Sequence, residues 1–456
     1  LKRKITDVGS MEFRILANSR KDRVASERAM AANGFQNPPN GFRWARLGEI
    51  VTGEHPKITE NKLIDTNQSW VRNRYSAPTV VRLVGKDSAG KESSGKEQSA
   101  VAPQRRLRLL IVDDSLFFRM RLCRALEASS SIVVAAEAGD GLEALALLAG
   151  GLDVDVISLD IEMPRMDGLT FLRHLRERAE TGSPLPPVVM LSSQTRMGAD
   201  ATLEALTLGA VDFVTKADQG DLQHFAQMVE RLIQRLLLAA LVPADKAVSR
   251  RGATIAVSGR RPAGAGPAEQ AVVIGASTGG PAALYQLLAA WPATLDAGVL
   301  IVQHMPPLFT ASLARGLDHV ATLPVREATD AEVVHRHEAL VAPGGSHLRV
   351  RPDRSVSLEG DPPLHGVRPA VDYTFASAAQ VWGPDLVAVV LSGMGIDGTE
   401  GAREVVNHGG RVLAQDQASC VVYGMPKSVV QAGLATRVLP LAEMARAIGD
   451  EFACRR

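Results

Sequence analysis

The stretch LRLLIVDDS (107–115) decides how the first half of the chain is interpreted. Residues 107–112 are apolar except for Arg108, so they predict a short buried strand, and Asp113 and Asp114 follow where it ends.

 The same pattern recurs further on, with strands predicted at 132–136, 155–159, 187–191 and 211–214 and helices at 117–126, 141–148, 169–178, 199–208 and 221–241. Strands that alternate with helices at this spacing predict a parallel sheet covered on both faces, so residues 105–241 are expected to form one doubly wound α/β domain.

Polar side chains stand at the ends of four of these strands. Asp113 and Asp114 follow the first strand, Asp160 the third, Ser192 the fourth and Lys216 the fifth. Because the carboxyl ends of parallel strands meet at one edge of a sheet, three carboxylates are expected to share a pocket. Such a cluster costs free energy unless a cation neutralises it, and Mg²⁺ prefers oxygen ligands of this kind. A single aspartate here would be interpreted as a solvated loop residue, but five groups at matching strand ends favour a site that binds a cation and a phosphoryl group.

The segments IVDDS, SLDIEMPRMDG, MLSS and FVTK resemble a response-regulator receiver domain of the flavodoxin-like class, and the resemblance spans 107–235. It implies that Asp160 accepts a phosphoryl group from a sensor histidine kinase of chemotaxis. It also implies that Ser192 and Lys216 contact this group. The magnesium ligands that it implies are Asp113, Asp114, Asp160 and the backbone carbonyl of Glu162.

A second domain is expected after a linker. Residues 242–270 are rich in proline, glycine, alanine and arginine, which is typical of a flexible connection. The apolar stretch AVVIG (271–275) then begins another α/β pattern, and we assign 271–456 to it. Its clearest strands are predicted at 298–303, 388–393 and 411–415, while 340–380 is rich in turns and is expected to contain β-hairpins. The predicted fold class is thus two doubly wound, mainly parallel α/β domains, the second Rossmann-like.

The sequence GASTGG (275–280) lies between a predicted strand and a predicted helix. A G-x-S-x-G turn in this position can expose Ser277 on a tight elbow beside backbone N–H groups that bind an oxyanion. A phosphate-binding loop of a nucleotide-binding domain is the alternative, but the G-x-G-x-x-G spacing and the Walker lysine are missing. Cys420 is a rival nucleophile without a histidine at a neighbouring strand end.

A serine nucleophile needs a base and an acid that orients the base. Of the ten histidines, His304 alone follows a predicted strand directly, so its side chain is expected in the same crevice as Ser277. Asp397, in SGMGIDG, lies beyond the strand at 388–393 and is the preferred acid, with Asp372 in RPAVDY as the second choice. Surface or structural roles are expected for the histidines of turn-rich and helical stretches, namely His335, His337, His347, His365 and His408.

The motifs IGASTGG, VQHMP, LSGMGIDG, RPAVD and YGMP resemble the catalytic domain of chemotaxis protein-glutamate methylesterases, the CheB family. The resemblance implies hydrolysis of glutamate methyl esters on methyl-accepting chemotaxis receptors and deamidation of specific receptor glutamines, which together drive sensory adaptation. Ser277, His304 and Asp397 would catalyse both reactions without a cofactor, with Met394 and Thr278 at the oxyanion hole. The unphosphorylated receiver would cover the esterase crevice, and phosphorylation would open it.

Composition limits the other functions. The 456 residues carry a formal net charge of +1, which gives no electrostatic argument for nucleic acid or for direct membrane binding. Three cysteines without a close pair, Cys123, Cys420 and Cys454, fit a reducing compartment, and no apolar stretch indicates export or a membrane span. A cytoplasmic protein is expected, which meets the membrane only through its receptors. A DNA-binding response regulator is the competing class, but the alternation of strands and helices after 271 disfavours a helix-turn-helix.

The first 104 residues differ from the rest of the chain. They contain 18 Lys and Arg against 11 Asp and Glu, show little hydrophobic periodicity, and include the polar stretch KDSAGKESSGKEQ (86–98). We assign them no fold and interpret 1–104 as an N-terminal extension that is either disordered or the product of a misplaced start, since the chain begins with Leu1.

Overall fold

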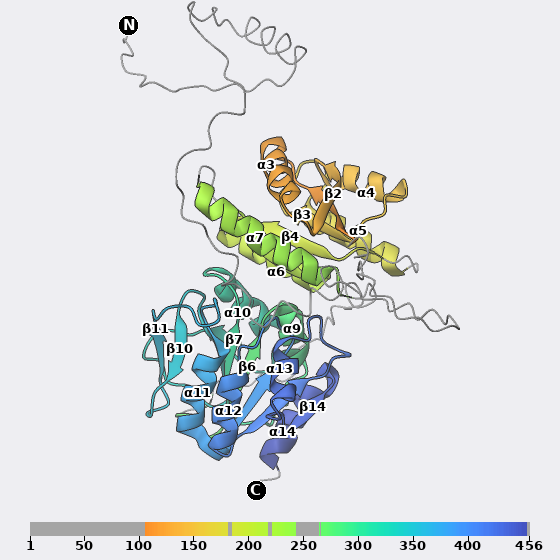
Figure 1. Cartoon of the computed structure of the whole chain (residues 1–456). Coiled ribbons are helices and arrows are strands. Elements are labelled where there is room, and N and C mark those ends of the chain that lie inside the picture. The colour runs from red at the N-terminus through yellow and green to blue at the C-terminus, as the bar shows by residue number, and fades with distance from the viewer. Residues whose placement is uncertain (1–104, 181–184, 218–220, 243–263, 265, 454–456) are drawn as a thin grey trace, which may run out of the picture. The chain divides into compact units, whose positions relative to one another are not determined.

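Two parallel sheets organise the chain (Figure 1). The computed structural model describes residues 105–180, 185–217, 221–242, 264 and 266–453. The interpretation of 1–104, most of the predicted linker and Cys454 lie outside these residues.

The first sheet has the strand order β2-β1-β3-β4-β5, and every pair of neighbours is parallel. The five strands are β1 (Leu107–Val112), β2 (Ile132–Ala138), β3 (Val156–Asp160), β4 (Val188–Ser192) and β5 (Asp212–Thr215). The helices are α3 (Leu116–Glu127), α4 (Gly141–Ala149), α5 (Gly168–Glu180), α6 (Arg196–Leu208) and α7 (Leu222–Ala239). All the elements predicted from the sequence are present. Helix α6 begins three residues earlier than predicted, because Thr195 accepts a hydrogen bond from the Gly198 N–H and caps it.

Helices cover both faces of this sheet, which explains the continuous apolar run of β1. Leu109 and Ile111 belong to the core beneath α3 and α7, and Leu110 and Val112 belong to the core beneath α4, α5 and α6. All four side chains are fully buried. Successive side chains of a strand point to opposite faces, so a strand with two buried faces has no polar alternation.

The second sheet has the order β14-β13-β12-β6-β7-β9-β8 and is parallel throughout. Its strands are β6 (Ala271–Ala276), β7 (Gly298–Gln303), β8 (Val325–Glu327), β9 (Glu338–Val341), β12 (Leu386–Val390), β13 (Arg411–Gln415) and β14 (Arg437–Leu439). The chain adds strands on one side of β6 and later returns to add strands on the other side. The order therefore reverses at β6, and a crevice is expected outside the carboxyl ends of β6 and its neighbours.

Six of the helices in the described part of the chain flank the second sheet (Figure 1). Helices α9 (Gly280–Ala289), α10 (Phe309–Val320) and α14 (Leu441–Ala453) contribute to the core on one face. Helices α11 (Val371–Trp382), α12 (Thr399–Asn407) and α13 (Met425–Gln431) contribute to the core on the other face. Both predicted domains are thus α/β units, as the sequence analysis expected.

The stretch 340–380 agrees with its prediction only in part. Strands β10 (His347–Val350) and β11 (Val356–Glu359) form the expected antiparallel hairpin. Helix α11, however, was not predicted. Its buried residues Val371, Phe375 and Trp382 follow helical spacing, but they come directly after a long turn-rich segment that hides the pattern.

The packed part of the second domain extends further toward the N-terminus than Ala271. Ala268 is fully buried, its N–H donates to the Val334 carbonyl at 2.8 Å, and its carbonyl accepts from Trp382 Nε1 at 2.9 Å. The end of the predicted linker is therefore part of this domain. None of the described helices combines the length and the apolar character that a membrane span requires.

Candidate phosphorylation and catalytic sites

Three carboxylates meet at the edge of the first sheet, where the strand order reverses between β1 and β3. Asp113 and Asp114 follow β1, and Asp160 is the last residue of β3. Asp113 and Asp160 are buried, whereas Asp114 is exposed. One oxygen from each carboxylate lies within 4.8 Å of the other two. The structure thus brings the three predicted acids together.

Lys216 enters this cluster from the end of β5. Its Nζ lies 2.6 Å from Asp160 Oδ2 and 2.8 Å from Asp113 Oδ2. Burial alone would lower the pKa of Lys216, but the two carboxylates hold it above its usual value. Burial raises the pKa of Asp160 to about 6, and the charge of Asp113 adds to this effect although Lys216 opposes it. One ammonium does not compensate three carboxylates, so the oxygen-rich cluster fits a hard divalent cation such as Mg²⁺.

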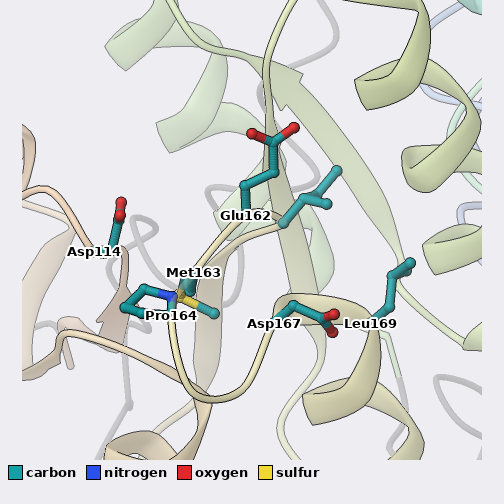
Figure 2. A pocket seen from close by; sticks show the side chains of 7 residues that line it. Asp114, Glu162, Met163, Pro164, Asp167 and Leu169 are labelled. Atoms are coloured by element: carbon teal, nitrogen blue, oxygen red, sulfur yellow. The ribbon is translucent and has the colours of Figure 1, made fainter.

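A cavity of about 550 Å³ opens beside the exposed acid of this cluster (Figure 2). Its lining is partly acidic and partly apolar, and consists of Asp114, Ile161, Glu162, Met163, Pro164, Asp167 and Leu169. Figure 2 shows Asp114 on one side of this space and Asp167 with Leu169 on the other. Asp114 is the member of the carboxylate cluster that lines this cavity, whereas Asp113 and Asp160 are not among its lining residues.

Ser192 lies at the end of β4 but its hydroxyl is engaged elsewhere. Ser192 Oγ accepts from Thr202 Oγ1 at 2.7 Å and donates to the Gly198 carbonyl at 3.2 Å, both on α6. The side chain is fully buried. In this conformation the predicted phosphoryl-contacting serine is therefore bonded to α6 and makes no hydrogen bond to the three carboxylates.

A second group of polar side chains meets at the ends of β12, β6 and β7, which are neighbours in the second sheet. Ser277 follows β6, His304 follows β7, and Asp397 lies in the loop after β12. His304 Nε2 is 2.8 Å from Asp397 Oδ2, and both side chains are at least nine-tenths buried. The acid paired with the histidine is thus Asp397, the preferred one of the two.

The hydrogen bonds of Asp397 fix its charge and position. Burial would raise the pKa of this carboxyl, but the hydrogen bond and charge of His304 and the surrounding N–H groups hold it below its usual value. Backbone N–H groups donate to it from Val371 at 2.7 Å, from Asp372 at 2.9 Å and from Gly398 at 2.9 Å. An ionised carboxylate only accepts hydrogen bonds, so His304 Nε2 is the donor in this contact.

Backbone and side-chain contacts from β7 and β12 hold the serine elbow. The Ser277 N–H donates to the Ser392 carbonyl at 3.0 Å, and Ser392 Oγ donates to the Thr278 carbonyl at 2.8 Å. Gln303 Nε2 donates to the Ser277 carbonyl at 3.0 Å. Gly280 leaves the space that Gln303 occupies, because a Cβ there would collide with Gln303 Oε1. In this conformation Ser277 Oγ and the His304 ring, both in the described part of the chain, are not hydrogen-bonded to each other.

Gln303 and Ser392 were not identified as site residues from the sequence. Both are polar residues buried at the ends of apolar strands, and they stand inside the motifs VQHMP and LSGMG. That combination was the available signal, since a buried polar side chain requires a hydrogen-bond partner. Their partners are backbone atoms of the elbow, which only the fold reveals.

The loop that contains Met394 packs against Ser277. A Cβ on Gly393 would lie 2.9 Å from Ser277 Cβ, so a glycine is required for this approach. The Gly393 N–H donates to the Val422 carbonyl at 3.0 Å, and the Met425 N–H donates to the Gly393 carbonyl at 2.9 Å. The YGMP motif thus holds the loop that was expected to help form the oxyanion hole. Cys420, the rival nucleophile, is buried.

Receiver residues contact the residue that follows Ser277. The described parts of both domains belong to one compact unit. Thr278 Oγ1 donates to Asp212 Oδ2 of β5 and accepts from Arg235 Nη1 of α7. Arg235 and Asp212 also form an ion pair at 2.9 Å. Nearby, the rings of Phe213 and Phe309 stack with centroids 4.6 Å apart.

These two sites define a class of protein. The first sheet carries a buried aspartate cluster with a lysine, as in response regulators, and the second carries a serine, a histidine and an aspartate at three adjacent strand ends. The chain is therefore a response regulator whose second domain has the site architecture of an ester hydrolase.

Comparison with known proteins gives the family. Residues 109–227 match the response regulator receiver domain, and residues 272–448 match the CheB methylesterase domain. A relative from Symbiobacterium thermophilum, named protein-glutamate methylesterase/protein-glutamine glutaminase, is 45% identical over 356 residues, which cover 76% of this chain and 97% of the relative. A relative of the same name from Pyrococcus horikoshii is 40% identical over 75% of this chain and 92% of its own length. The chain belongs to the CheB methylesterase family, which confirms the resemblance and disfavours a DNA-binding or nucleotide-binding second domain.

The raised pKa of Asp160 gives a testable pH dependence of stability. The folded carboxyl has a pKa of about 6, above its ordinary value, so between about pH 4 and pH 6 the folded state binds more protons than the unfolded state. Stability from this group is present at low pH and is lost as the pH rises through 6. We expect Asp160→Asn, which cannot ionise, to raise the free energy of unfolding at pH 7.5 by up to about 3 kcal/mol, and the gain to shrink toward pH 4.

Urea unfolding from pH 4 to pH 8 in the presence of a chelator measures this difference. Asp153→Asn, at an exposed carboxylate that pairs with Arg108, is the matched control and should follow the original protein. A constant difference between Asp160→Asn and the original protein across this range would contradict the assignment.

Proposed function

We propose that this chain is a phosphorylation-activated protein-glutamate methylesterase and protein-glutamine glutaminase of bacterial chemotaxis. Its substrates would be methyl-accepting chemotaxis receptors, its phosphodonor a chemotaxis histidine kinase, and its location the cytoplasm. The observation that carries the proposal is the buried hydrogen bond between His304 and Asp397 beside the Ser277 elbow. The family membership supports the choice of substrate.

In the proposed first half-reaction, Ser277 Oγ attacks the carbonyl carbon of a glutamate methyl ester. His304 Nδ1 takes the hydroxyl proton, and Asp397 stabilises the resulting imidazolium. Backbone N–H groups of Met394 and Thr278 would bind the oxyanion of the tetrahedral intermediate. The C–O bond to the methoxy group then breaks, His304 returns the proton to the leaving oxygen, and methanol departs from a glutamyl ester of Ser277.

Water completes the cycle. His304 removes a proton from the water molecule as the water oxygen attacks the acyl carbon, and the proton then passes to the departing Ser277 oxygen. The products are a glutamate carboxylate and the free serine. A glutamine substrate follows the same steps with ammonia as the leaving group, and neither reaction requires a cofactor. Before the attack, the Ser277 side chain must turn toward His304. Catalytic hydrogen bonds of this kind often form fully only when substrate is bound.

For the receiver, we propose that Asp160 is the phospho-acceptor. Asp113, Asp114 and Asp160, with the backbone carbonyl of Glu162, would hold Mg²⁺, which supplies positive charge to the phosphoryl oxygens. Lys216 already contacts Asp160 and would balance the phosphoryl charge. Ser192 would exchange its hydrogen bonds with α6 for one to a phosphoryl oxygen.

Strand β5 offers a physical link between phosphorylation and the esterase site. Asp212, its first residue, bonds to Thr278 next to the nucleophile, and Lys216 follows its other end and bonds to Asp160. Helix α6, which holds Ser192, packs against α10 of the second domain. A phosphoryl group that draws Lys216 and Ser192 inward would disturb both contacts and favour a state in which the receiver uncovers the serine.

The first test of the proposal is Ser277→Ala. Without the nucleophile, methanol release from methylated receptor membranes should fall by roughly a thousandfold or more. Radiolabelled methanol measured with the full-length protein reports this directly. Ser357→Ala, on the β10–β11 hairpin, is the control and should keep its activity. Undiminished release from the Ser277 variant would remove the serine mechanism.

The second test addresses phosphorylation. Addition of a small phosphodonor with Mg²⁺ should increase methanol release by the original protein. The variant Asp160→Asn should keep the basal rate and lose the increase, because the amide cannot form the acyl phosphate. The exposed-site variant Asp153→Asn should respond as the original protein does. If Asp160→Asn is stimulated equally, another residue receives the phosphoryl group.

The third test addresses the contact between the domains. We expect Asp212→Ala, which removes both the ion pair to Arg235 and the hydrogen bond from Thr278, to raise the basal rate without phosphodonor by roughly three- to thirtyfold, the range of typical coupling free energies. Asp153→Ala, at an exposed receiver carboxylate, should leave the basal rate as it is. An unchanged or lower basal rate in Asp212→Ala would show that this contact does not restrain the esterase.

A further inference from the structure

Asp372, the second-choice acid, lies beside the serine, histidine and aspartate site without contacting His304. Its backbone N–H donates to Asp397 Oδ1 at 2.9 Å, while its side chain turns to two other partners. Asp372 Oδ1 accepts from the Gly401 N–H at 2.6 Å, and Oδ2 lies 2.9 Å from His365 Nε2. The carboxylate is 7% exposed. Oxygen and nitrogen atoms of His365, Asp372 and Asp397 lie within 4.8 Å of one another.

The chain presents His365 on a tight turn. The Leu364 N–H donates to the Val367 carbonyl at 3.1 Å, and the Val367 N–H donates to the Leu364 carbonyl at 3.0 Å. The two residues between them, His365 and Gly366, have φ of 53° and 76°. Positive φ is uncommon for residues other than glycine, and histidine is one of the few that adopt it readily. The turn places the imidazole of His365 directly on a buried carboxylate, and this placement indicates a role for the contact.

Asp372 also ties two helices together at the site. It stands in the first turn of α11, and its carboxylate accepts the Gly401 N–H from the first turn of α12. A Cβ at Gly401 would lie 2.9 Å from the Asp372 Cα, so these helices approach closely there. Asp397 lies just before α12 and accepts two N–H groups from the start of α11. The Asp372 side chain therefore fixes the donors that hold Asp397.

We propose that Asp372 and His365 form a second carboxylate–imidazole pair, which positions Asp397 and places the Asp372 carboxylate behind His304, so that the esterase rate depends on the charge of Asp372. The inference rests on the proposed function. Asp372 acts through Asp397 and is a positioning residue. The negative charge would stabilise the imidazolium of His304 in the same sense as Asp397, but from a greater distance.

The charge state of Asp372 supports this role. Burial, followed by the charge of Asp397, raises the pKa of Asp372 to about 6, while the Gly401 N–H and His365 oppose the rise. The carboxylate is thus present above about pH 6 and is lost as the pH falls through that value. His365 helps to keep Asp372 ionised at neutral pH.

The other charged groups of the surrounding elements are engaged elsewhere. Glu400 and Arg403 of α12 pair with each other at 3.2 Å and are exposed. Tyr373 of α11 donates to Glu359 and stacks on His347. The groups that face Asp372 are therefore His365 and Asp397, with His304 reached through Asp397.

Two substitutions separate positioning by charge from a merely structural role. Asp372→Asn keeps an oxygen that accepts the Gly401 N–H but removes the charge. We expect kcat to fall about tenfold above pH 6 with KM unchanged, and the difference from the original protein to shrink below that pH, where Asp372 is neutral in the original protein as well. His365→Asn keeps a residue that tolerates positive φ but cannot reach Asp372. Asp372 then protonates at higher pH, so kcat should fall toward the Asp372→Asn value at a higher pH than in the original protein.

The measurement is methanol release by the full chain from pH 5 to pH 8, with circular dichroism to confirm folding. The double variant should behave as Asp372→Asn, because His365 acts through Asp372. His408→Asn, which removes an exposed imidazole beside Glu404 on α12, is the matched control and should leave the profile unchanged.

The outcomes separate the inference from the function on which it rests. If the original protein releases no methanol above the Ser277→Ala blank, the proposed function fails. If it is active but both variants keep its kcat and its pH dependence, the pair has no electrostatic role and the inference is overturned. Should Asp372→Asn fail to fold, His365→Asn, whose side chain lies on a partly exposed turn, decides between the outcomes: a fall in kcat that occurs at higher pH than in the original protein supports the pair, and an unchanged pH dependence overturns it.

Discussion

The carboxylate of Asp397 holds the second site together. It accepts hydrogen bonds from His304 after β7, from two N–H groups at the start of α11, and from the N–H of Gly398. A buried carboxylate without such partners would be strongly destabilising, so the four donors offset its desolvation and also fix its orientation. Because those donors come from separate segments, the position of His304 depends on the packing of α11 and α12 as much as on the sheet.

The two sites treat buried negative charge in opposite ways. Asp397 is surrounded by donors, and its pKa lies below the usual range. Asp160 has a single cation nearby and a pKa of about 6, because burial outweighs the attraction of Lys216. A carboxylate held by several hydrogen-bond donors suits a residue that must keep one orientation throughout a reaction. A cluster of three carboxylates with one lysine is stabilised when a further cation binds. Asp160, with its raised pKa, can then exchange its contact with Lys216 for other partners.

Much of this arrangement could be predicted from the sequence, because the rule that carboxyl ends of parallel strands meet requires only the strands and the polar residues after them. That rule brings Asp113, Asp160 and Lys216 together and places Ser277 near His304. It does not give the rotamer of Ser192, which depends on hydroxyl and carbonyl partners on α6. It also does not locate Asp397, which lies several residues beyond β12, and the choice over Asp372 depended on flanking glycines. Helix α11 and its two N–H donors were not predicted.

Two side-chain contacts at the second site were beyond the sequence for the same reason. Gln303 donates to the Ser277 carbonyl, 26 residues earlier in the chain, and His365 contacts the Asp372 carboxylate across a turn and the start of α11, so no spacing rule connects these partners. His365 was assigned a surface or structural role because its segment is rich in turns. The turn is the feature that brings its imidazole to a buried acid, so local irregularity was a poor guide to function here.

The contact between Asp212 and Thr278 gives restraint by the receiver an electrostatic side as well as a steric one. Thr278 is the residue after Ser277, and its N–H is a proposed oxyanion donor, so a carboxylate bonded to its hydroxyl stands close to where negative charge would develop. Like charges at short range in a buried site oppose each other strongly. Arg235 offsets this charge only while all three side chains stay together. If phosphorylation acts as proposed, movement of β5 would remove the carboxylate and the obstruction in one step, and the strand that precedes Lys216 would release both restraints.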